Sequence, residues 1–324
     1  MTGLPYAALL AKLGAMFLVM GVGWWLRRAQ WLVAGSAATL SRITIGVAFP
    51  CLTLEQMLRT LDRTALHQSL PLVGLGFLLM VVSAAIGFGL AHRLAGEPPR
   101  LRTVAFLIAI PNWIFLPLPL AQSLAGDVGT RTVLLLNVPA QVILWTVGLG
   151  LLRGAWRGGH GLRSLLTNPG LLATAAAVVL TIVFPASAQW HASVSPMGML
   201  VQGAGLLGGL TVPLSLIITG AQLAELRLAH AAPSALARVL VGRLVIAPLV
   251  CVFLVEYGGR LLGLDPQVRI VTALVAAMPV AVSCSMFVER YGGDRDLSAQ
   301  SILLSTVGCI VSVPLVVALM GWLQ

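Results

Sequence analysis

Long apolar runs dominate this chain, and short polar or charged stretches separate them. An α-helix needs about 20 mainly apolar residues to cross a bilayer, and ten runs come close to that length. The longest connection between them is the basic stretch 153–168. The pattern predicts an all-α polytopic membrane protein with ten transmembrane helices and no soluble domain. The predicted spans are 5–26, 36–58, 69–91, 102–125, 131–152, 169–186, 197–224, 233–256, 268–289 and 298–322.

Prolines recur in the two halves of the chain at offsets between 163 and 175 residues. Each pair falls in corresponding helices: first and sixth, second and seventh, fourth and ninth, fifth and tenth. Because five spans per half is an odd number, the second half must enter the membrane upside down, as in inverted-repeat transporters. We predict two repeats, 1–152 and 169–324, joined by a cytoplasmic linker, 153–168. The pairs are Pro5 with Pro169, Pro50 with Pro213, Pro111 with Pro279, and Pro139 with Pro314.

The fourth and ninth predicted spans are expected to be broken. The fourth contains AIPNWIFLPLPL, with Pro111, Pro117 and Pro119 inside nine residues. Proline removes a backbone N–H and clashes with the carbonyl one turn back. A single proline therefore predicts a kinked helix, whereas three prolines this close together predict a broken one. The ninth contains AAMPVAVSCSM, in which short polar residues follow Pro279. Two such breaks would expose helix ends near mid-membrane, and helix N-termini favour anions.

Composition indicates lipid as the solvent. Hydrophobic residues make up 58% of the chain and charged residues 9%, against roughly a quarter charged in soluble domains. A net charge of +10 would point to nucleic acid in a soluble protein, but short basic loops beside an anionic leaflet account for it here. The four cysteines show no CxxC spacing and are expected to be reduced packing residues. No metal, cofactor or nucleic acid is expected.

Arginine counts predict the orientation. Loops after odd-numbered helices hold twelve arginines and the opposite loops hold five, including Arg260 and Arg269. The positive-inside rule places the odd loops in the cytoplasm and both termini on the non-cytoplasmic side. The first run is expected to be a retained span, because no cleavage site followed by a soluble domain is present. Arg42 and Arg243 fall within spans, where arginine indicates function by default or, alternatively, a snorkelling or carbonyl-bonded structural role.

The sequence resembles the auxin efflux carrier family, including its bacterial members, over nearly its whole length. The resemblance is carried by LSRITIGVAFPCLTL in the second span, PNWIFLPLPL in the fourth, NVPAQVILWTVG in the fifth, TVPLSLIITGAQL in the seventh, and MPVAVSCSMFVERYGGDRDLSAQSILLSTVGCIVSVPL in the ninth and tenth. It implies a scaffold and a transport domain, each drawn from both repeats, and an X-shaped crossover of helices 4 and 9. It also implies a homodimer and elevator-type transport of an organic anion bound beside the crossover.

The resemblance also implies which residues bind the substrate. Pro111, Asn112 and Pro279 match crossover positions, and Thr53, Asn137 and Gln141 match polar positions lining the site. Two residues depart from the family pattern: Pro117 replaces a glycine, and Ser283, also a candidate ligand, stands where bacterial relatives often carry asparagine. By its own chemistry Asn112 can hydrogen-bond a carboxylate, cap a broken helix end or pair with another helix. The hydroxyls of Thr53 and Ser283 can instead bond their own helix carbonyls.

Carboxylates are absent where a cation carrier would need them. No Asp or Glu lies between residues 101 and 125 or between 270 and 288, while Glu55, Glu225 and Glu256 lie towards predicted helix ends. Because intramembrane acids neutralise or carry a transported cation, this pattern favours an anion carrier without tight sodium coupling.

The leading hypothesis is a secondary transporter of a mono- or dicarboxylate, or an auxin-like acid, in a bacterial inner membrane. The alternative on the same fold is a sodium-coupled organic anion symporter of the bile-acid type. An enzyme is not predicted, because no HExxH motif, Cys/His cluster or Ser–His pair at catalytic spacing is present. A channel would need a continuous polar pore.

Overall fold

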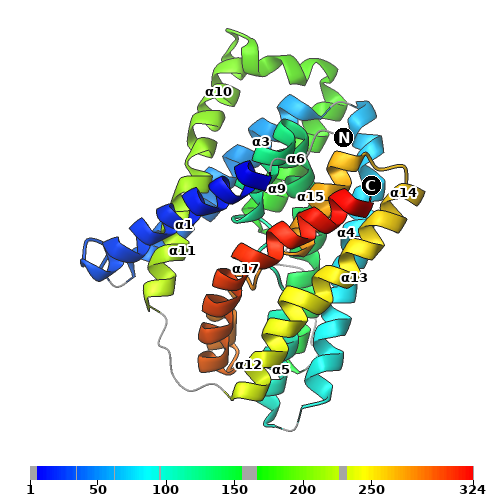
Figure 1. Ribbon diagram of the computed structural model, residues 1–324. Helices are drawn as coiled ribbons and strands as arrows, with labels where there is room; N and C mark the ends of the chain where they lie inside the picture. The colour runs from blue at the N-terminus through cyan, green and yellow to red at the C-terminus, as the bar shows by residue number, and fades with distance from the viewer. Residues whose placement is uncertain are drawn as a thin grey trace.

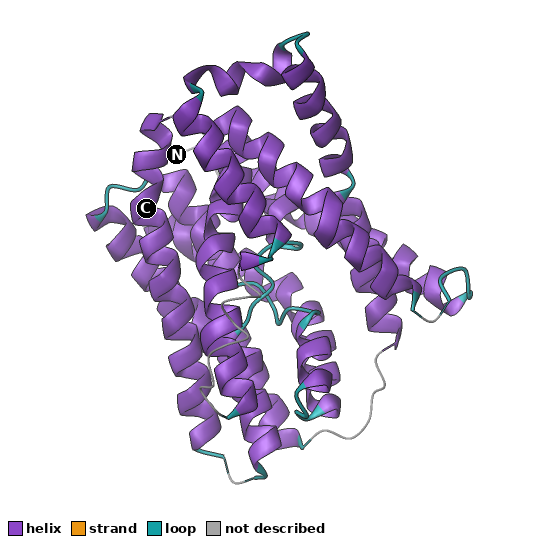
Figure 2. Cartoon of the chain, turned by 180° about the vertical axis from the view of Figure 1, so that it is seen from behind, coloured by secondary structure: helices purple, strands orange, loops and turns teal. Residues whose placement is uncertain are grey.

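The computed structural model is helical throughout the part of the chain that it describes, apart from one isolated bridge between two loop segments. Figure 2 shows loop segments crossing near the middle of the helical body as well as at its surface. Pro5 and most of the predicted linker 153–168 lie outside the described residues. Those described are 6–33, 35–61, 63–94, 96–154, 166–225 and 232–323.

Within these residues, seven helical segments are long and apolar enough to cross a membrane. An eighth is added if the bent pair of α9 (Pro169–Val183) and η3 (Pro185–Ala192) forms one span. The predicted ninth span is missing from this count because it is interrupted and its pieces are short. The second piece of the predicted fourth span is counted together with the fifth, as the segment Pro117–Arg153, which is kinked at Ala125 and Gly126. The prediction of an all-α polytopic membrane protein is confirmed, whereas the count of ten stays a prediction.

One set of helices, called here the peripheral group, is built around α1 and α3. α1 packs along α11, and α3 packs against α9 and α10. In Figure 1, α1 and α11 lie side by side and α10 extends beyond the other helices. Besides α9 and η3, the group contains α1 (Tyr6–Arg28), α2 (Ser36–Ile43), the π-helical turn η1 (Thr44–Ala48), α3 (Phe49–Thr60), α10 (Pro196–Gly209) and α11 (Thr211–Glu225).

The other helices form what we call the central group. α4 packs on α5 and α6, α15 packs on α6 and α17, and α12 packs on α5 and α17. The two groups meet where α1 and α3 contact α6 and α17. The bounds are α4 (Arg63–His92), α5 (Pro98–Ala109), α6 (Pro117–Ile143), η2 (Leu144–Gly148), α7 (Leu149–Arg153), α12 (Pro233–Val241), η4 (Gly242–Ile246), α13 (Ala247–Phe253), η5 (Leu254–Gly258), α14 (Gly259–Leu261), α15 (Pro266–Ala276), α16 (Cys284–Arg290) and α17 (Arg295–Leu323).

Glycines let α1 and α11 touch backbone to backbone. A Cβ added at Gly220 would lie 1.8 Å from the Met20 carbonyl oxygen, and one at Gly23 would lie 2.1 Å from the Ile217 carbonyl oxygen. Small residues allow such close approach in membranes, where lipid supplies no hydrophobic force between helices. This contact holds α11, which carries part of the candidate site described below.

Two interruptions lie at the centre of the protein, as the prolines predict. Residues 110–116 separate α5 from α6, and residues 277–283 separate α15 from α16. Both helices that lead into the interruptions are buried along most of their length, over 103–109 in α5 and 271–276 in α15. A helix that is apolar on all sides belongs in the core rather than at the lipid surface.

The two interruptions pair with each other. The Asn112 N–H donates to the Pro279 carbonyl at 2.8 Å, and the Ala281 N–H donates to the Ile110 carbonyl at 3.4 Å. Pro111 and Val280 face each other in a short antiparallel bridge. Each broken helix therefore supplies hydrogen-bond partners for the unwound backbone of the other, which water cannot do inside a bilayer.

A buried ion pair joins η5 to α15 and bears on two sequence expectations. Glu256 is 2% exposed, and its Oε1 lies 3.0 Å from Nη1 of Arg269, which is also buried; Arg260 is its second partner. The expectation that Arg269 lies in a loop is wrong, and Glu256, expected towards a helix end, is buried rather than at the surface. The helical segment continues to Leu261, and α15 begins at Pro266, so both residues lie inside packed helices.

Removing Glu256 should destabilise the protein far more than removing an exposed partner. Glu256→Gln leaves the Arg269 guanidinium buried beside a weaker acceptor, and breaking a buried pair costs about 3–5 kcal/mol. We expect the melting temperature in detergent to fall by roughly 5 °C or more.

The matched control is Glu225→Gln, which removes a carboxylate that is 37% exposed and paired with Arg27. Exposed pairs contribute about 0–1 kcal/mol, so this variant should melt close to the wild type. Equal, small shifts for both variants would contradict a stabilising role of the buried pair.

Candidate functional site

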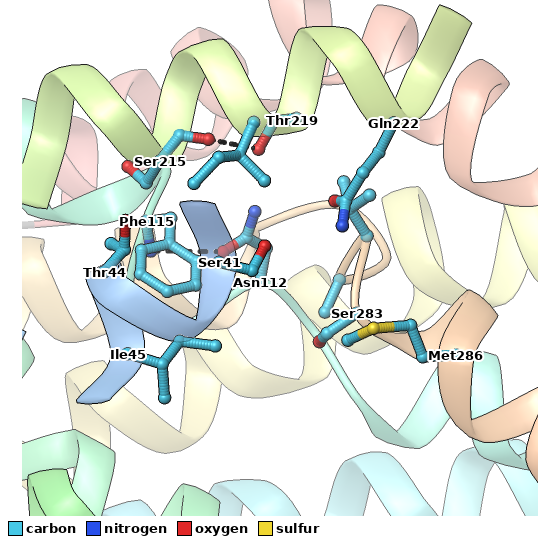
Figure 3. Close-up of a pocket in the computed structure, with 13 residues that line it drawn as sticks. Ser41, Thr44, Ile45, Asn112, Phe115, Ser215, Thr219, Gln222, Ser283 and Met286 are labelled. Atoms are coloured by element: carbon cyan, nitrogen blue, oxygen red, sulfur yellow. Dashed lines mark hydrogen bonds between the residues drawn. The ribbon is translucent and has the colours of Figure 1, made fainter. Parts of the chain in front are cut away.

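A cavity of about 50 Å³ lies between the two interruptions and the helices α2, η1 and α11 (Figure 3). The peripheral group supplies α2, η1 and α11, while the central group supplies both interruptions and α16. Most small-molecule pockets measure about 300–1,000 Å³, so this one has room for a single polar head group or a few waters. Its lining residues are Ser41, Thr44, Ile45, Asn112, Phe115, Ser215, Ile218, Thr219, Gln222, Ala281, Val282, Ser283 and Met286.

Asn112 is fixed at the centre of this lining. Its backbone N–H is used in the pairing with Pro279, and its side-chain Oδ1 accepts a hydrogen bond of 3.2 Å from the Phe115 N–H. This bond closes a local turn between Asn112 and Phe115 ahead of α6, and a role of Asn112 in substrate binding stays a prediction. No hydrogen-bond partner of the Nδ2 group occurs among the described residues, and the side chain is 6% exposed. Asn112 consequently presents an amide donor whose orientation is set by the bond to Phe115.

The polar face of α11 lies opposite Asn112. Ser215, Thr219 and Gln222 are spaced four and three residues apart, and Figure 3 shows all three on the α11 side of the cavity. Thr219 Oγ1 donates to the Ser215 carbonyl at 2.8 Å, and the Ser215 hydroxyl donates to its own helix as well. Gln222 makes no such bond within the described part of the chain. Its amide is the donor that α11 offers to a ligand.

These residues were missed by the sequence analysis, although a signal was available. Thr211, Ser215, Thr219 and Gln222 form a polar stripe on one face of an otherwise apolar helix, at the spacing of helical neighbours. Thr44 adds a buried hydroxyl that has no partner among the described residues. A buried polar group without a partner is costly, so Thr44 marks a place where a ligand or water is expected.

The structure brings some predicted site residues together and not others. Ser283 lines the cavity, and Pro111 and Pro279 lie in the paired interruptions beside Asn112. Thr53 is buried in α3, where its hydroxyl donates to the Phe49 carbonyl at 2.9 Å, and it is not among the lining residues. For Thr53 the bond to its own helix, considered as the alternative, is the one present.

Asn137 and Gln141 form a separate amide cluster. Gln141 Nε2 donates to Asn137 Oδ1, and Gln141 Oε1 accepts from both Trp145 Nε1 and Asn168 Nδ2, each at 3.2 Å. Asn137 is fully buried, and its Nδ2 has no partner among the described residues. The Trp145 ring packs edge-on against Phe287, the neighbour of the cavity residue Met286. None of the cluster's residues lines the cavity, and its role in binding stays a prediction.

The cavity lining carries no charged residue, but a buried arginine lies at the paired helix ends. Arg243 is 0% exposed and donates from Nη1 to the Ile108 carbonyl at 3.0 Å and from Nη2 to the Ala276 carbonyl. Of the two readings of this residue, the carbonyl-bonded arginine is confirmed. Arg42, in contrast, is exposed on α2. No three His, Cys, Asp or Glu side chains of the described residues meet to hold a metal ion.

Comparison with known proteins agrees with this architecture. A family model described as membrane transport protein matches residues 9–160 and 157–317. The chain belongs to this family. The resemblance to auxin efflux carriers is thereby confirmed. The family match and the long apolar helices together indicate that the chain is an integral membrane protein. An uncharacterized transporter of Methanothermobacter thermautotrophicus is 26% identical to it over 308 residues, which are 94% of this chain and 93% of the relative.

Substitutions at Asn112 should separate its two roles. Asn112→Asp keeps an oxygen to accept from the Phe115 N–H but replaces the amide donor with negative charge, so it should lose anion binding. Because the position is 6% exposed, the unpaired carboxylate should also lower the melting temperature. Asn112→Ala should lose binding and also the bond to the Phe115 N–H, at a cost of about 1 kcal/mol. Thermal shifts of purified protein with a panel of mono- and dicarboxylates measure both effects.

The comparison variant is Asn137→Asp in the neighbouring amide cluster. If Asn112→Asp keeps the carboxylate-induced shift and Asn137→Asp loses it, the binding site is the amide cluster and not the cavity.

Proposed function

We propose that this membrane transport protein is a secondary carrier for a small organic anion, a mono- or dicarboxylate or an auxin-like acid, in a bacterial inner membrane. The observation that carries the proposal is the cavity at the paired interruptions, which holds a fixed Asn112 amide donor and no charged side chain in its lining. Amide and hydroxyl donors satisfy a carboxylate without a permanent counter-charge. A transported cation would instead call for carboxylates at this position.

The positions of the prolines and the packing of the helices support an inverted repeat. Pro50 and Pro213 both fall in the first turn of a helix, in α3 and α11, and Pro139 and Pro314 both fall inside long helices. The family match also consists of two stretches that meet at residues 157–160, inside the predicted linker. We infer ten spans in two repeats, 1–152 and 169–324, with a crossover of the fourth and ninth.

The packing of the two helix groups supports the scaffold and transport domains that we propose. With ten spans in two repeats, the peripheral group contains spans 1, 2, 6 and 7 and the central group spans 3, 4, 5, 8, 9 and 10, so each group takes matching spans from both halves. The cavity lies between the groups. Sliding of the central group along the peripheral group would carry a bound anion across the membrane, which is the elevator mechanism.

Polar links across this boundary fit a movable contact. Arg59 of α3 pairs with Asp127 of α6 at 2.6 Å, and Asn168, the cap of α9, donates to Gln141 of α6. Exposed or half-buried pairs of this kind contribute little stability, so they can be exchanged for others as the groups slide. The proposal further includes a homodimer and both termini on the non-cytoplasmic side.

Counterflow of labelled carboxylates into proteoliposomes tests the function. We expect uptake of at least one mono- or dicarboxylate that is the same in sodium and in choline buffers, because no acidic residue lines the cavity. Protein-free vesicles and the Asn112→Asp variant should show none.

Strict sodium dependence in the same assay would instead favour a sodium-coupled symporter of the bile-acid type. Ohmic conductance in planar bilayers, without counterflow, would contradict a carrier altogether.

A further inference from the structure

We propose that Arg243 acts as a built-in cation at the crossing of the broken helices, in the place where sodium-coupled carriers hold their ion. The proposal rests on the proposed function and deepens it, because it names the residue that makes anion transport independent of sodium.

The contacted carbonyls belong to the ends of both broken helices. Ile108 is the penultimate residue of α5 and Ala276 is the last residue of α15. The last four carbonyls of a helix have no partner within the helix, and at these ends some are used locally, since Phe106 accepts from the Ile110 N–H. Arg243 donates to one carbonyl of each helix, so a single side chain joins the two ends.

The guanidinium is fully buried and has no carboxylate partner. It is 0% exposed, it forms no ion pair among the described residues, and its Nε has no acceptor there. An arginine stays protonated in proteins, so a full positive charge lies in the core. Such a charge is tolerated only where something balances it.

The helix ends supply that balance. Each helix C-terminus carries roughly half a negative charge, so the ends of α5 and α15 together come to about one negative charge, which one guanidinium cancels. Half-helix C-termini and unwound carbonyls are also the groups that bind coupling cations in carriers with broken helices. Without a cation these ends would repel an anion bound beside the interruptions.

The local backbone is adapted to this contact. Arg243 lies in the π-helical turn η4, and single π-turns inside helices are often found at functional sites. Gly242 beside it lets η4 approach α5, because a Cβ there would lie 2.7 Å from the Ile108 Cδ1 atom. The insertion and the glycine together bring the guanidinium to the carbonyl ends.

The test compares Arg243→Ala with Arg243→Lys and with Arg238→Ala. Arg238 is the matched control, because it lies one turn and a half earlier in the same span and also donates to a carbonyl, that of Leu90 in α4, which is not at the crossing. The first readout is the melting temperature in choline, sodium or dilute methylguanidinium chloride, without substrate. The second is carboxylate counterflow in the same ions.

We expect wild type and Arg243→Lys to be indifferent to the replacement of choline by sodium in both readouts. Arg243→Ala should melt roughly 5 °C or more lower in choline and should regain melting temperature and counterflow in methylguanidinium or sodium. Arg238→Ala should regain neither. Rescue by the free cation distinguishes a replaced charge from a general packing defect.

Several results would overturn the proposal. They are an Arg243→Ala protein that no cation restores, an Arg238→Ala protein that is restored equally, or sodium dependence of Arg243→Lys. If Arg243→Ala folds only when it is expressed and purified with methylguanidinium and not in choline, the proposal stands. If the variant folds in neither choline nor methylguanidinium, the proposal is overturned. If wild type moves no carboxylate while the melting rescue is observed, the proposed function fails and the role of Arg243 as a cation remains.

Discussion

The constraint on which this structure depends is that no water is available at mid-membrane to satisfy a broken backbone. Prolines at 111, 117 and 279 prevent continuous helices in the core of the protein, and every N–H and carbonyl that they release needs a partner. The partners come from the second interruption: Asn112 bonds Pro279, and Ala281 bonds Ile110. Each interruption is therefore stable only in the presence of the other, which explains why breaks in the two halves of the chain occur together.

The need to satisfy backbone groups also explains the hydrogen bonds that side chains make around the crossing. Ser305 of α17 accepts the Val280 N–H at 3.2 Å, Asn112 closes the local turn ahead of α6, and Arg243 donates to the two helix ends. These three residues come from different elements, α17, the interruption 110–116 and η4, and all of them hydrogen-bond backbone groups. The backbone N–H and the Oδ1 atom of Asn112 are used in these bonds, whereas its Nδ2 group has no partner among the described residues and lies beside the cavity. The proposed binding group, Asn112 Nδ2, is thus the one donor of this residue that the backbone does not use.

Sequence reasoning reached the breaks but not the whole site, for a physical reason. Proline effects are local, so Pro111, Pro117 and Pro279 predicted the interruptions, and an amide next to Pro111 predicted a role for Asn112. The cavity wall on α11 depends on how α1 and α11 pack through Gly23 and Gly220, which no local pattern reveals. Arg269 was counted as a loop residue because a charge at the edge of a predicted span is expected to face water, whereas its pairing with Glu256 lets both residues be buried.

The small volume of the cavity carries a consequence for how an anion is held. About 50 Å³ accommodates a carboxylate head group but not the rest of a dicarboxylate or an aromatic acid, so under the proposed mechanism selectivity for the remainder would come from the surfaces of the two groups. The polar donors sit on both sides, Asn112 on the central group and Gln222 on the peripheral group. In the proposed carrier, a head group bound between them would be desolvated on both faces, and sliding would exchange one set of donors while the other is retained. Asn112 would be the donor that moves with the interruptions, because its turn bond to Phe115 and its backbone bond to Pro279 tie it to them and not to α11.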